Sequence, residues 1–358
     1  MTRLDPTKLG CGAHDFRHGL GRLVIGQDEA LDQVAEVYQT YLAGLTPSHR
    51  PIGNFLFLGP TGTGKTRVVE ATAEVLVQNP RAVIKVDCGE FQHSHEIAKL
   101  LGSPPGYLGH RETQAMFSQQ VLNQYHTEKC KVSFVMFDEI EKASDALWNL
   151  LLGILDKGTL TLGDNRKTDF SSSIIFLTSN LGATEISNLV SGGLGFVKPV
   201  ATVKNLATAG VTAARKKFTP EFINRLDKIV TFKPLGEKEL RAIVDLELGE
   251  IQKRLYRSPG NYFHIAVTEA ARLALLREGT DPRYGARHLK RAIEKRIVQA
   301  LSNLIVTVQV RAGDTLEIGY DGQGYTFDST PGVVLPTLAA AQMVIAVPTS
   351  AAGVRADR

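Results

Sequence analysis

Short apolar runs alternate with helical patterns along most of the chain. Four runs have the length and composition of buried strands: 55–58, 82–86, 132–137 and 174–177. Apolar residues then recur on one helical face through Val68–Leu76 and again through Leu147–Leu155, and Gly158 follows where a helix C-terminus favours glycine. Strands that are apolar on both faces and alternate with helices predict an α/β fold, in which helices flank a parallel sheet.

The pattern changes after Pro234 and Gly236, which interrupt the chain. Three long segments then have helical spacing: 237–255, 267–278 and 286–305. Two strand-like segments follow around a hairpin-type turn at Asp321-Gly322. We therefore predict a smaller, mainly helical domain with a short β element after the large α/β domain. The predicted bounds are an N-terminal tail at 1–16, the large domain at 17–233, the small domain at 234–330 and a disordered tail at 331–358.

Composition excludes several classes of protein. Apolar residues make up 43% of the 358 residues and charged residues 22%, as in soluble globular proteins. The net charge of +4 comes without any long run of like charges, so it gives no argument for nucleic acid. Three isolated cysteines suggest neither a zinc site nor disulfides, and they fit a reducing cytoplasm. No apolar stretch is long enough for a membrane span, and the N-terminus does not resemble a signal peptide.

A glycine-rich segment directly after the first apolar run matches the phosphate-loop pattern known as Walker A. Its residues are Gly59, Pro60, Thr61, Gly62, Thr63, Gly64, Lys65 and Thr66. Glycines let several backbone N–H groups point at phosphate oxygens, Lys65 adds positive charge at the β- and γ-phosphates, and Thr66 offers a hydroxyl to Mg²⁺. A glycine turn with an incidental lysine is the alternative. The strand before the loop and the helix after it favour a phosphate loop that binds ATP or ADP.

Two carboxylates and one amide close the apolar runs that follow. Asp138 and Glu139 come at the end of the third run, where open α/β sheets bind ligands. Asp138 is predicted to hold Mg²⁺, and Glu139 to act as general base on the attacking water. Asn180 closes the next run and is predicted to contact the γ-phosphate or that water. The alternatives are an acidic helix N-terminus for the pair and a turn asparagine for Asn180.

These parts, in this order, resemble the AAA+ superfamily. Within it the sequence is most similar to the second ATPase module of the Clp unfoldases and disaggregases (ClpA, ClpB and ClpC), over roughly Gly21 to Phe327. The stretches that carry the resemblance are Val24–Gln27, Arg50–Gly53, Gly59–Thr66, Pro104–Gly109, Phe137–Ala143, Thr178–Gly182, Phe218–Arg225 and Tyr284–Arg287.

The resemblance implies roles that spacing alone does not give. Val24 and Ile25 would pack against adenine. Arg225 resembles the arginine finger that reaches the γ-phosphate of a neighbouring subunit, and Arg287 resembles the sensor arginine that contacts nucleotide within its own subunit. A surface ion pair is the alternative for either arginine. An arginine acting in trans implies self-association into a ring, usually a hexamer in this family.

Two loops bear on the substrate and on partners. Tyr107 lies between glycines after two prolines, and in the family the equivalent loop lines a central pore and pulls on polypeptide. A packing tyrosine is the alternative. The stretch 191–196 faintly resembles the loop by which some unfoldases dock a peptidase, and an ordinary loop is as good an interpretation.

The sequence therefore predicts a Mg²⁺-dependent ATPase of the AAA+ type. We expect it to act as a ring-forming chaperone that threads polypeptide, with a peptidase or adaptor as a possible partner. The alternative is an AAA+ motor or scaffold that acts on nucleic acid or on a dedicated partner. A nucleic-acid motor would need a basic pore with aromatic residues, and the stretch around Tyr107 has mixed charge.

Overall fold

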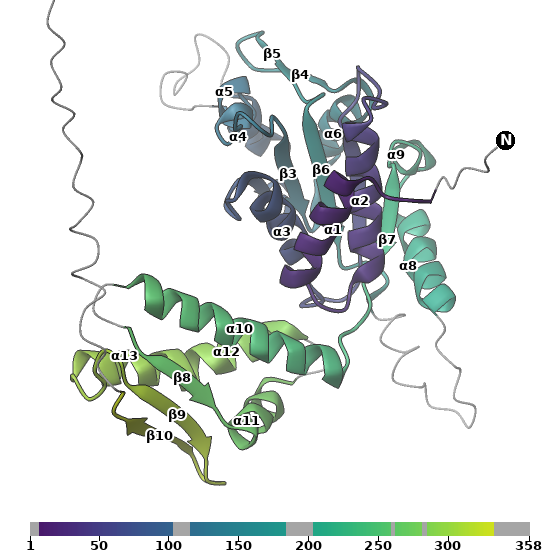
Figure 1. The fold of residues 1–358 in the computed structure, drawn as a ribbon. Coiled ribbons are helices and arrows are strands. Elements are labelled where there is room, and N and C mark those ends of the chain that lie inside the picture. Colours follow the sequence, from purple (N-terminus) through teal and green to yellow (C-terminus); the bar gives the residue numbers. More distant parts are fainter. Residues whose placement is uncertain (1–6, 103–114, 184–202, 259–261, 281–284, 333–358) are drawn as a thin grey trace, which may run out of the picture. The chain divides into compact units, whose positions relative to one another are not determined.

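The computed structural model describes residues 7–102, 115–183, 203–258, 262–280 and 285–332 (Figure 1). Its contacts divide the chain into two compact units. The first contains Met1–Glu247 and Leu275–Ile293, and the second contains Leu248–Ala274 and Glu294–Arg358. Among the described residues, no helix is both long and apolar enough to cross a lipid bilayer.

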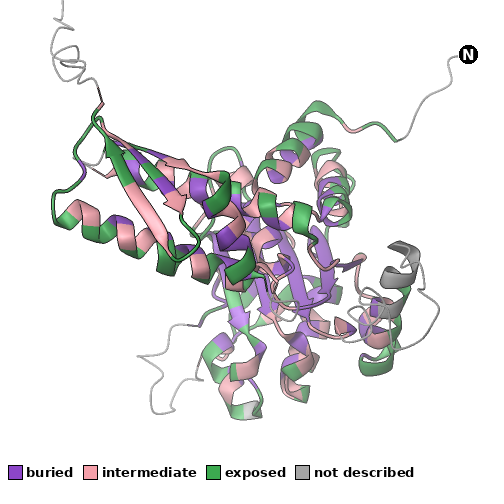
Figure 2. Cartoon of the chain, turned by 90° about the horizontal axis from the view of Figure 1, so that it is seen from below, coloured by how far each residue is buried: buried purple, intermediate pink, exposed green. Residues whose placement is uncertain are grey.

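A parallel five-stranded sheet with the order β2-β3-β6-β1-β7 forms the centre of the first unit. Its strands are β1 (Gly53–Leu58), β2 (Val83–Asp87), β3 (Ser133–Asp138), β6 (Ser173–Ser179) and β7 (Lys228–Thr231). Every residue of β1 and β6 is buried, and Figure 2 shows the sheet in the colour of buried residues. Strands buried on both faces read as continuous apolar runs, which is why the sequence revealed them.

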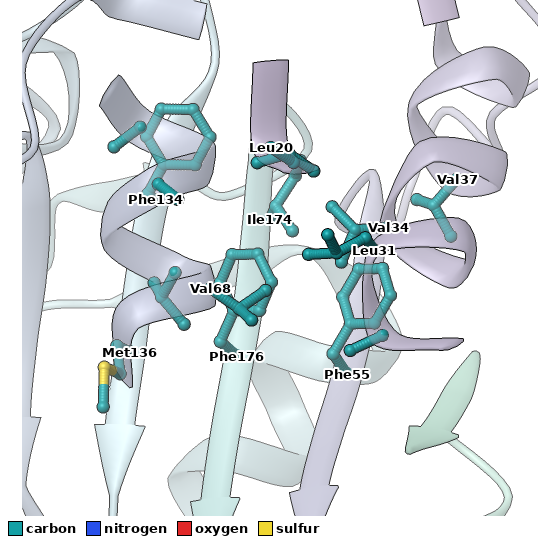
Figure 3. Close-up of a cluster of buried hydrophobic side chains, with 14 of the residues drawn as sticks. Leu20, Leu31, Val34, Val37, Phe55, Val68, Phe134, Met136, Ile174 and Phe176 are labelled. Carbon is teal, nitrogen blue, oxygen red and sulfur yellow. The ribbon is translucent and has the colours of Figure 1, made fainter. Parts of the chain in front are cut away.

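Helices cover both faces of this sheet because successive strand side chains point to opposite sides. Phe55 and Phe57 of β1 belong to one hydrophobic cluster, and Leu56 and Leu58 belong to the other. Figure 3 shows the first cluster, in which α1 (Cys11–Leu23), α2 (Asp28–Leu42) and α3 (Lys65–Val77) pack on the sheet. The second cluster includes residues of α6 (Asp145–Lys157). The shorter or peripheral elements are α4 (Ala98–Leu101), α5 (Gln119–Asn123), β4 (Thr159–Thr161), β5 (Lys167–Asp169), α8 (Val203–Lys217) and α9 (Pro220–Ile223).

The second unit contains a three-stranded sheet, β10-β9-β8. Strands β9 (Thr315–Tyr320) and β10 (Tyr325–Thr330) form the predicted hairpin, in which Asp321 Oδ1 accepts hydrogen bonds from the backbone of Gln323 and Gly324. Strand β8 (His264–Val267) pairs parallel to β9. Helix α13 (Gln299–Val306) and the π-helical turn at Glu294–Val298 that precedes it belong to this unit. Helix α12 (Ala286–Ile293) belongs to the first unit, and the division between the units falls within α10 (Glu237–Arg257) and α11 (Glu269–Gly279).

The predicted fold class is confirmed: a parallel sheet flanked by helices precedes a mainly helical part with a short β element. One prediction needs correction. The N-terminal tail expected over 1–16 is shorter, because α1 begins at Cys11 and buries Ala13 and Phe16. The sequence pattern did not predict α2, α8, the β4–β5 pair, β7 or β8. The tail predicted at 331–358 lies almost wholly outside the described residues.

Gly158 ends α6 in a left-handed conformation with φ of 59°. An alanine Cβ there would lie 3.2 Å from the carbonyl oxygen of His49 and 3.4 Å from Cα of Arg50. We expect Gly158→Ala to lower the free energy of unfolding by about 1–2 kcal/mol, the cost of left-handed backbone for a residue with a Cβ. Trp148, the sole tryptophan, lies in the same helix and reports the urea unfolding midpoint by fluorescence.

Gly153→Ala is the matched control, because it changes the same residue type within the same helix. A Cβ at Gly153 meets nothing within 4 Å, so alanine there should stabilise the helix by about 0.5–1 kcal/mol. Equal unfolding midpoints for the two variants would contradict the assignment of Gly158 as a required left-handed helix end.

Candidate nucleotide-binding site

The phosphate loop joins β1 to α3 at the carboxyl edge of the sheet. Strand β1 ends at Leu58 and α3 begins at Lys65, so the loop occupies the gap between a buried strand and a helix N-terminus. Gly59 has φ of 138°, and a Cβ there would lie 2.7 Å from the carbonyl oxygen of Phe232. Only glycine fits this position, where the loop turns against the residue that follows β7. The arrangement confirms the predicted strand–loop–helix context.

Lys65 is buried at the start of α3, and its ammonium group has three hydrogen-bond acceptors. Nζ donates to the carbonyl oxygens of Gly59 at 2.7 Å and Pro60 at 2.9 Å, and to Oδ1 of Asn180 at 3.0 Å. Burial lowers the pKa of Lys65 to about 8, against the opposing effect of nearby carboxylates such as Asp138. A desolvated ammonium of this kind gains from an anionic partner, which a phosphate group would supply.

The two predicted carboxylates lie at the carboxyl end of one strand, β3, beside the neighbouring parallel strand β6. Asp138 ends β3 and accepts a hydrogen bond from the hydroxyl of Thr178 on β6. Glu139 follows with a positive φ of 54°, an uncommon backbone conformation for a residue other than glycine. Its Oε2 pairs with Nζ of Lys142 at 2.5 Å, and this hydrogen bond lowers the pKa of Glu139. The Glu139 carboxyl is therefore ionised at neutral pH.

Asn180 connects the phosphate loop to Glu139. Its Oδ1 accepts from Nζ of Lys65 and from Oγ1 of Thr61 at 3.3 Å, while its Nδ2 donates to Oε1 of Glu139 at 3.0 Å. The backbone N–H of Asn180 donates to Oε1 of Glu141 at 3.1 Å. One amide thus contacts the lysine expected at the phosphates and the glutamate expected at the attacking water. This placement supports the role proposed for Asn180 over that of a turn asparagine.

A cavity of about 240 Å³ opens beside these groups, within the first unit. One part of its lining is apolar, and the other part is polar and charged. The apolar lining includes Leu23, Val24, Ile25, Leu235, Ile243 and Leu246. The polar lining includes the residues 61–66, Asp138, Glu139, Asn180 and Arg287. A flat apolar base and a charged phosphate chain need these two kinds of surface side by side.

Arg225 is not among the residues that line this cavity. It lies between α9 and β7, where its Nη2 pairs with Oε1 of Glu221 at 3.0 Å and its Nε lies 3.7 Å from Oδ1 of Asp156. Arg287, by contrast, lines the cavity. The structure therefore brings together the predicted nucleotide-site residues except Arg225, which forms ion pairs within its own chain.

Comparison with known proteins gives the family. The AAA domain of the Cdc48 subfamily matches residues 50–229, and the C-terminal D2-small domain of ClpB protein matches residues 235–318. This chain belongs to the Clp branch of the AAA+ ATPases. The predicted resemblance and the expected class of enzyme, an ATPase family, are confirmed at this level.

Similar proteins give the same assignment for this AAA+ chain. It is 38% identical over 307 residues to the Clp protease ATP-binding subunit ClpC of Staphylococcus saprophyticus, covering 86% of the chain and 36% of that protein. It is 38% identical over 304 residues to the chaperone ClpB of Bdellovibrio bacteriovorus, covering 85% and 33%. A solved structure of Hsp104 in a closed state with ATPγS and FITC-casein matches with a TM-score of 0.73 and 31% identity, covering 90% of the chain and 53% of Hsp104. The chain thus spans about a third of the curated relatives it matches.

The residues present in this AAA+ site fit Mg²⁺ held together with a nucleotide. Thr66 and Asp138 both line the cavity. The described residues contain no cluster of three or more histidine, cysteine, aspartate or glutamate side chains that would hold a metal alone. Mg²⁺ ordinarily takes one or two protein ligands and completes its shell with water and phosphate oxygens. Bound there, it would neutralise charge on the phosphate chain.

Among the side chains that contact the predicted ones, three at the ends of β3 and β6 were not predicted to belong to the site. They are Thr178, Glu141 and Lys142, which bond to Asp138, to the backbone of Asn180 and to Glu139. All three fall inside the stretches that carried the family resemblance, so that resemblance was the signal available. Tyr107 and the stretch 191–196 lie outside the described residues.

Proposed function

We propose that this chain hydrolyses ATP and uses the energy to unfold or remodel polypeptide, as part of a ring. The observation that carries the proposal is the Lys65–Asn180–Glu139 connection at the edge of the sheet, because it joins a phosphate-binding group to a general base. The AAA+ family membership supports nucleotide use, and similarity to ClpB, ClpC and Hsp104 supports a polypeptide substrate.

Each group has one task in the proposed reaction. Backbone N–H groups of the phosphate loop and Nζ of Lys65 stabilise negative charge on the phosphates. Asn180 orients the attacking water, and the carboxylate of Glu139 accepts its proton. Thr66 and Asp138 hold Mg²⁺, while Val24 and Ile25 pack against adenine. Arg287 contacts nucleotide within its own subunit, and Arg225 reaches the site of a neighbour.

Because Arg225 acts on a neighbouring subunit, the active site of an isolated subunit is incomplete. We therefore propose that the subunits assemble into a hexameric ring. The structure described as Hsp104 with ATPγS and FITC-casein supports polypeptide as the substrate of this chain as well. A peptidase or an adaptor is the further partner that we propose for the ring. The stretch 191–196, outside the described residues, is the candidate contact for a peptidase.

The test is the ATP hydrolysis rate per subunit against protein concentration, with and without FITC-casein. A shared site predicts that the rate per subunit rises with concentration, because assembly completes each site. Casein should raise it further. A rate per subunit that is independent of protein concentration would exclude the trans-acting arginine. A rate that neither casein nor other unfolded proteins change would favour the alternative of an AAA+ scaffold that acts on a dedicated partner.

We expect Tyr107→Ala to retain ATP hydrolysis within about threefold and to lose substrate-coupled threading, because an aromatic side chain grips polypeptide by packing. Unfolding of a tagged fluorescent protein measures threading directly. Tyr107→Phe is the matched control, since it keeps the ring and should retain threading. Tyr107→Ala rings that unfold the tagged protein at the wild-type rate would refute a pore role for this residue.

A further inference from the structure

Strand β1 contains one polar side chain, Asn54, which is completely buried. Burying an amide costs free energy unless its polar atoms are hydrogen-bonded, and Oδ1 of Asn54 has no partner among the described residues, so the donors of Nδ2 carry the compensation. Nδ2 of Asn54 donates to two backbone carbonyl oxygens, that of Arg225 at 3.1 Å and that of Leu155 at 3.3 Å. These acceptors are distant in sequence, and one belongs to the arginine proposed to act on a neighbouring subunit. Asn54 therefore fixes the backbone of Arg225 from the core of the sheet.

Arg50 donates to the same two carbonyl groups from the segment that leads into β1. Its Nη2 donates to the carbonyl oxygen of Arg225 at 3.0 Å, and its Nε to that of Leu155 at 3.4 Å. The planar guanidinium suits this paired contact, because its N–H groups diverge in a fixed fork. The side chains of Arg50 and Asn54, at the N-terminal end of β1, thus both donate to the backbone of the turn that contains Arg225.

Asp227 completes the arrangement two residues after Arg225. Its Oδ2 accepts from the backbone N–H of Asn54 at 2.8 Å, and its own N–H donates to the carbonyl of Asn54 at 2.9 Å. Its Oδ1 lies 3.6 Å from Nη2 of Arg50. Arg50, Asn54 and Asp227, here called the β1 bracket, therefore hold the turn on which Arg225 lies.

The side chain of Arg225 is held as well as its backbone. Its Nη1 donates to the carbonyl oxygen of Glu221 at 2.9 Å, in addition to the ion pair between Nη2 and that glutamate. Asp156, the nearby carboxylate, follows Leu155 in α6, whose carbonyl the β1 bracket also binds. The bracket thus ties the last turn of α6 and the Arg225 turn to a single strand.

We propose that Arg50, with Asn54 and Asp227, is a positioning residue for Arg225 and sets where this arginine meets the neighbouring subunit. The proposal rests on the trans role of Arg225 given above. A misplacement of about 1 Å in a catalytic group can cost on the order of 100-fold in rate. Strand β1 runs from the bracket at its start to the phosphate loop at its end. A subunit's own phosphate loop and the arginine it lends to its neighbour are therefore attached to opposite ends of one buried strand.

Mixed rings separate the two roles of each subunit. Arg225→Ala chains keep an intact site and lend no arginine, whereas Glu139→Gln chains lend Arg225 and do not hydrolyse ATP. A one-to-one mixture should hydrolyse ATP although each variant alone is inactive. Adding Arg50→Met to the Glu139→Gln chain should lower the hydrolysis of the mixture by about tenfold, less than the full effect of a misplacement of about 1 Å because Asn54 and Asp227 still hold the Arg225 turn. Adding it to the Arg225→Ala chain should change hydrolysis less than about twofold, because only the lent arginine depends on Arg50.

This asymmetry distinguishes positioning from a general loss of structure, which would lower hydrolysis in both mixtures. Arg17→Met is the matched control, because Arg17 also bonds two partners, Asp28 and Asp32, at a distance from the bracket. Arg50→Lys should restore only part of the hydrolysis, since one ammonium lacks the fork. If Arg50→Met does not fold, as judged by lost nucleotide binding, Arg50→Lys replaces it in the Glu139→Gln chain.

If Arg50→Met changed hydrolysis equally in the Glu139→Gln chain and in the Arg225→Ala chain, whether the change was large or absent, the positioning role alone would be overturned. Failure of the simple Glu139→Gln donor to rescue Arg225→Ala would overturn the trans role of Arg225, and this proposal with it. The two failures are therefore distinguishable within one set of mixtures.

Discussion

Glu139→Gln is expected to lower the rate of ATP hydrolysis by about 10³-fold and to leave the affinity for ATP within about twofold, because a general base contributes on the order of 10²–10⁴. Glutamine keeps an oxygen that can accept from Nδ2 of Asn180, so the geometry of the site should persist. It cannot take the proton of the attacking water, and it loses the ion pair with Lys142. Single-turnover hydrolysis measures the first quantity, and titration with a fluorescent ATP analogue measures the second.

Glu36→Gln is the control for removing one carboxylate of an ion pair away from the cavity. Glu36 of α2 pairs with Lys228 of β7 at 2.7 Å and neither residue lines the cavity, so hydrolysis should change less than about twofold. If Glu139→Gln hydrolysed ATP at the wild-type rate, another group would be the base and the assignment of this site would be wrong. If it lost nucleotide affinity as well, the main role of Glu139 would be structural.

The phosphate loop and the strand ends could be predicted because their signals are local. A fully buried strand reads as a run of apolar residues, and the loop pattern sits directly at its end. Since all strands of a parallel sheet end at one edge, Asp138 and Asn180 could be placed near each other without coordinates. The register confirms this placement, because Phe137 pairs with Leu177 on the neighbouring strand.

The contacts among those residues could not be predicted. That Asn180 points its oxygen at Lys65 and its nitrogen at Glu139 depends on side-chain geometry, which sequence spacing does not contain. The edge strand β7 was missed because four residues at the edge of the sheet carry too short a pattern. The β1 bracket joins Asn54 to Asp227 across 173 residues of sequence, and only the folded chain shows that pairing.

Arg225→Ala is expected to lower ATP hydrolysis by on the order of 10³-fold with nucleotide affinity unchanged, since an arginine finger acts on charge that develops in the transition state. A trans role is proposed because Arg225 lies outside the cavity of its own chain, whereas its ion pair with Glu221 is also what the alternative of a surface ion pair predicts. The remaining rate per subunit should no longer rise with protein concentration, because assembly then adds no catalytic group. Hydrolysis at a series of concentrations measures both effects.

Arg287→Ala provides the opposite pattern within the same fold. Arg287 lines the cavity, so its loss should weaken nucleotide binding in the isolated chain, whereas loss of Arg225 should not. The two arginines are alike in chemistry, so a difference in affinity between the variants reports location alone. Weakened nucleotide binding by isolated Arg225→Ala chains would place that arginine in its own subunit's site. The subunit would then be catalytically complete without a neighbour, and assembly into a ring would have to serve the polypeptide rather than the hydrolysis of ATP.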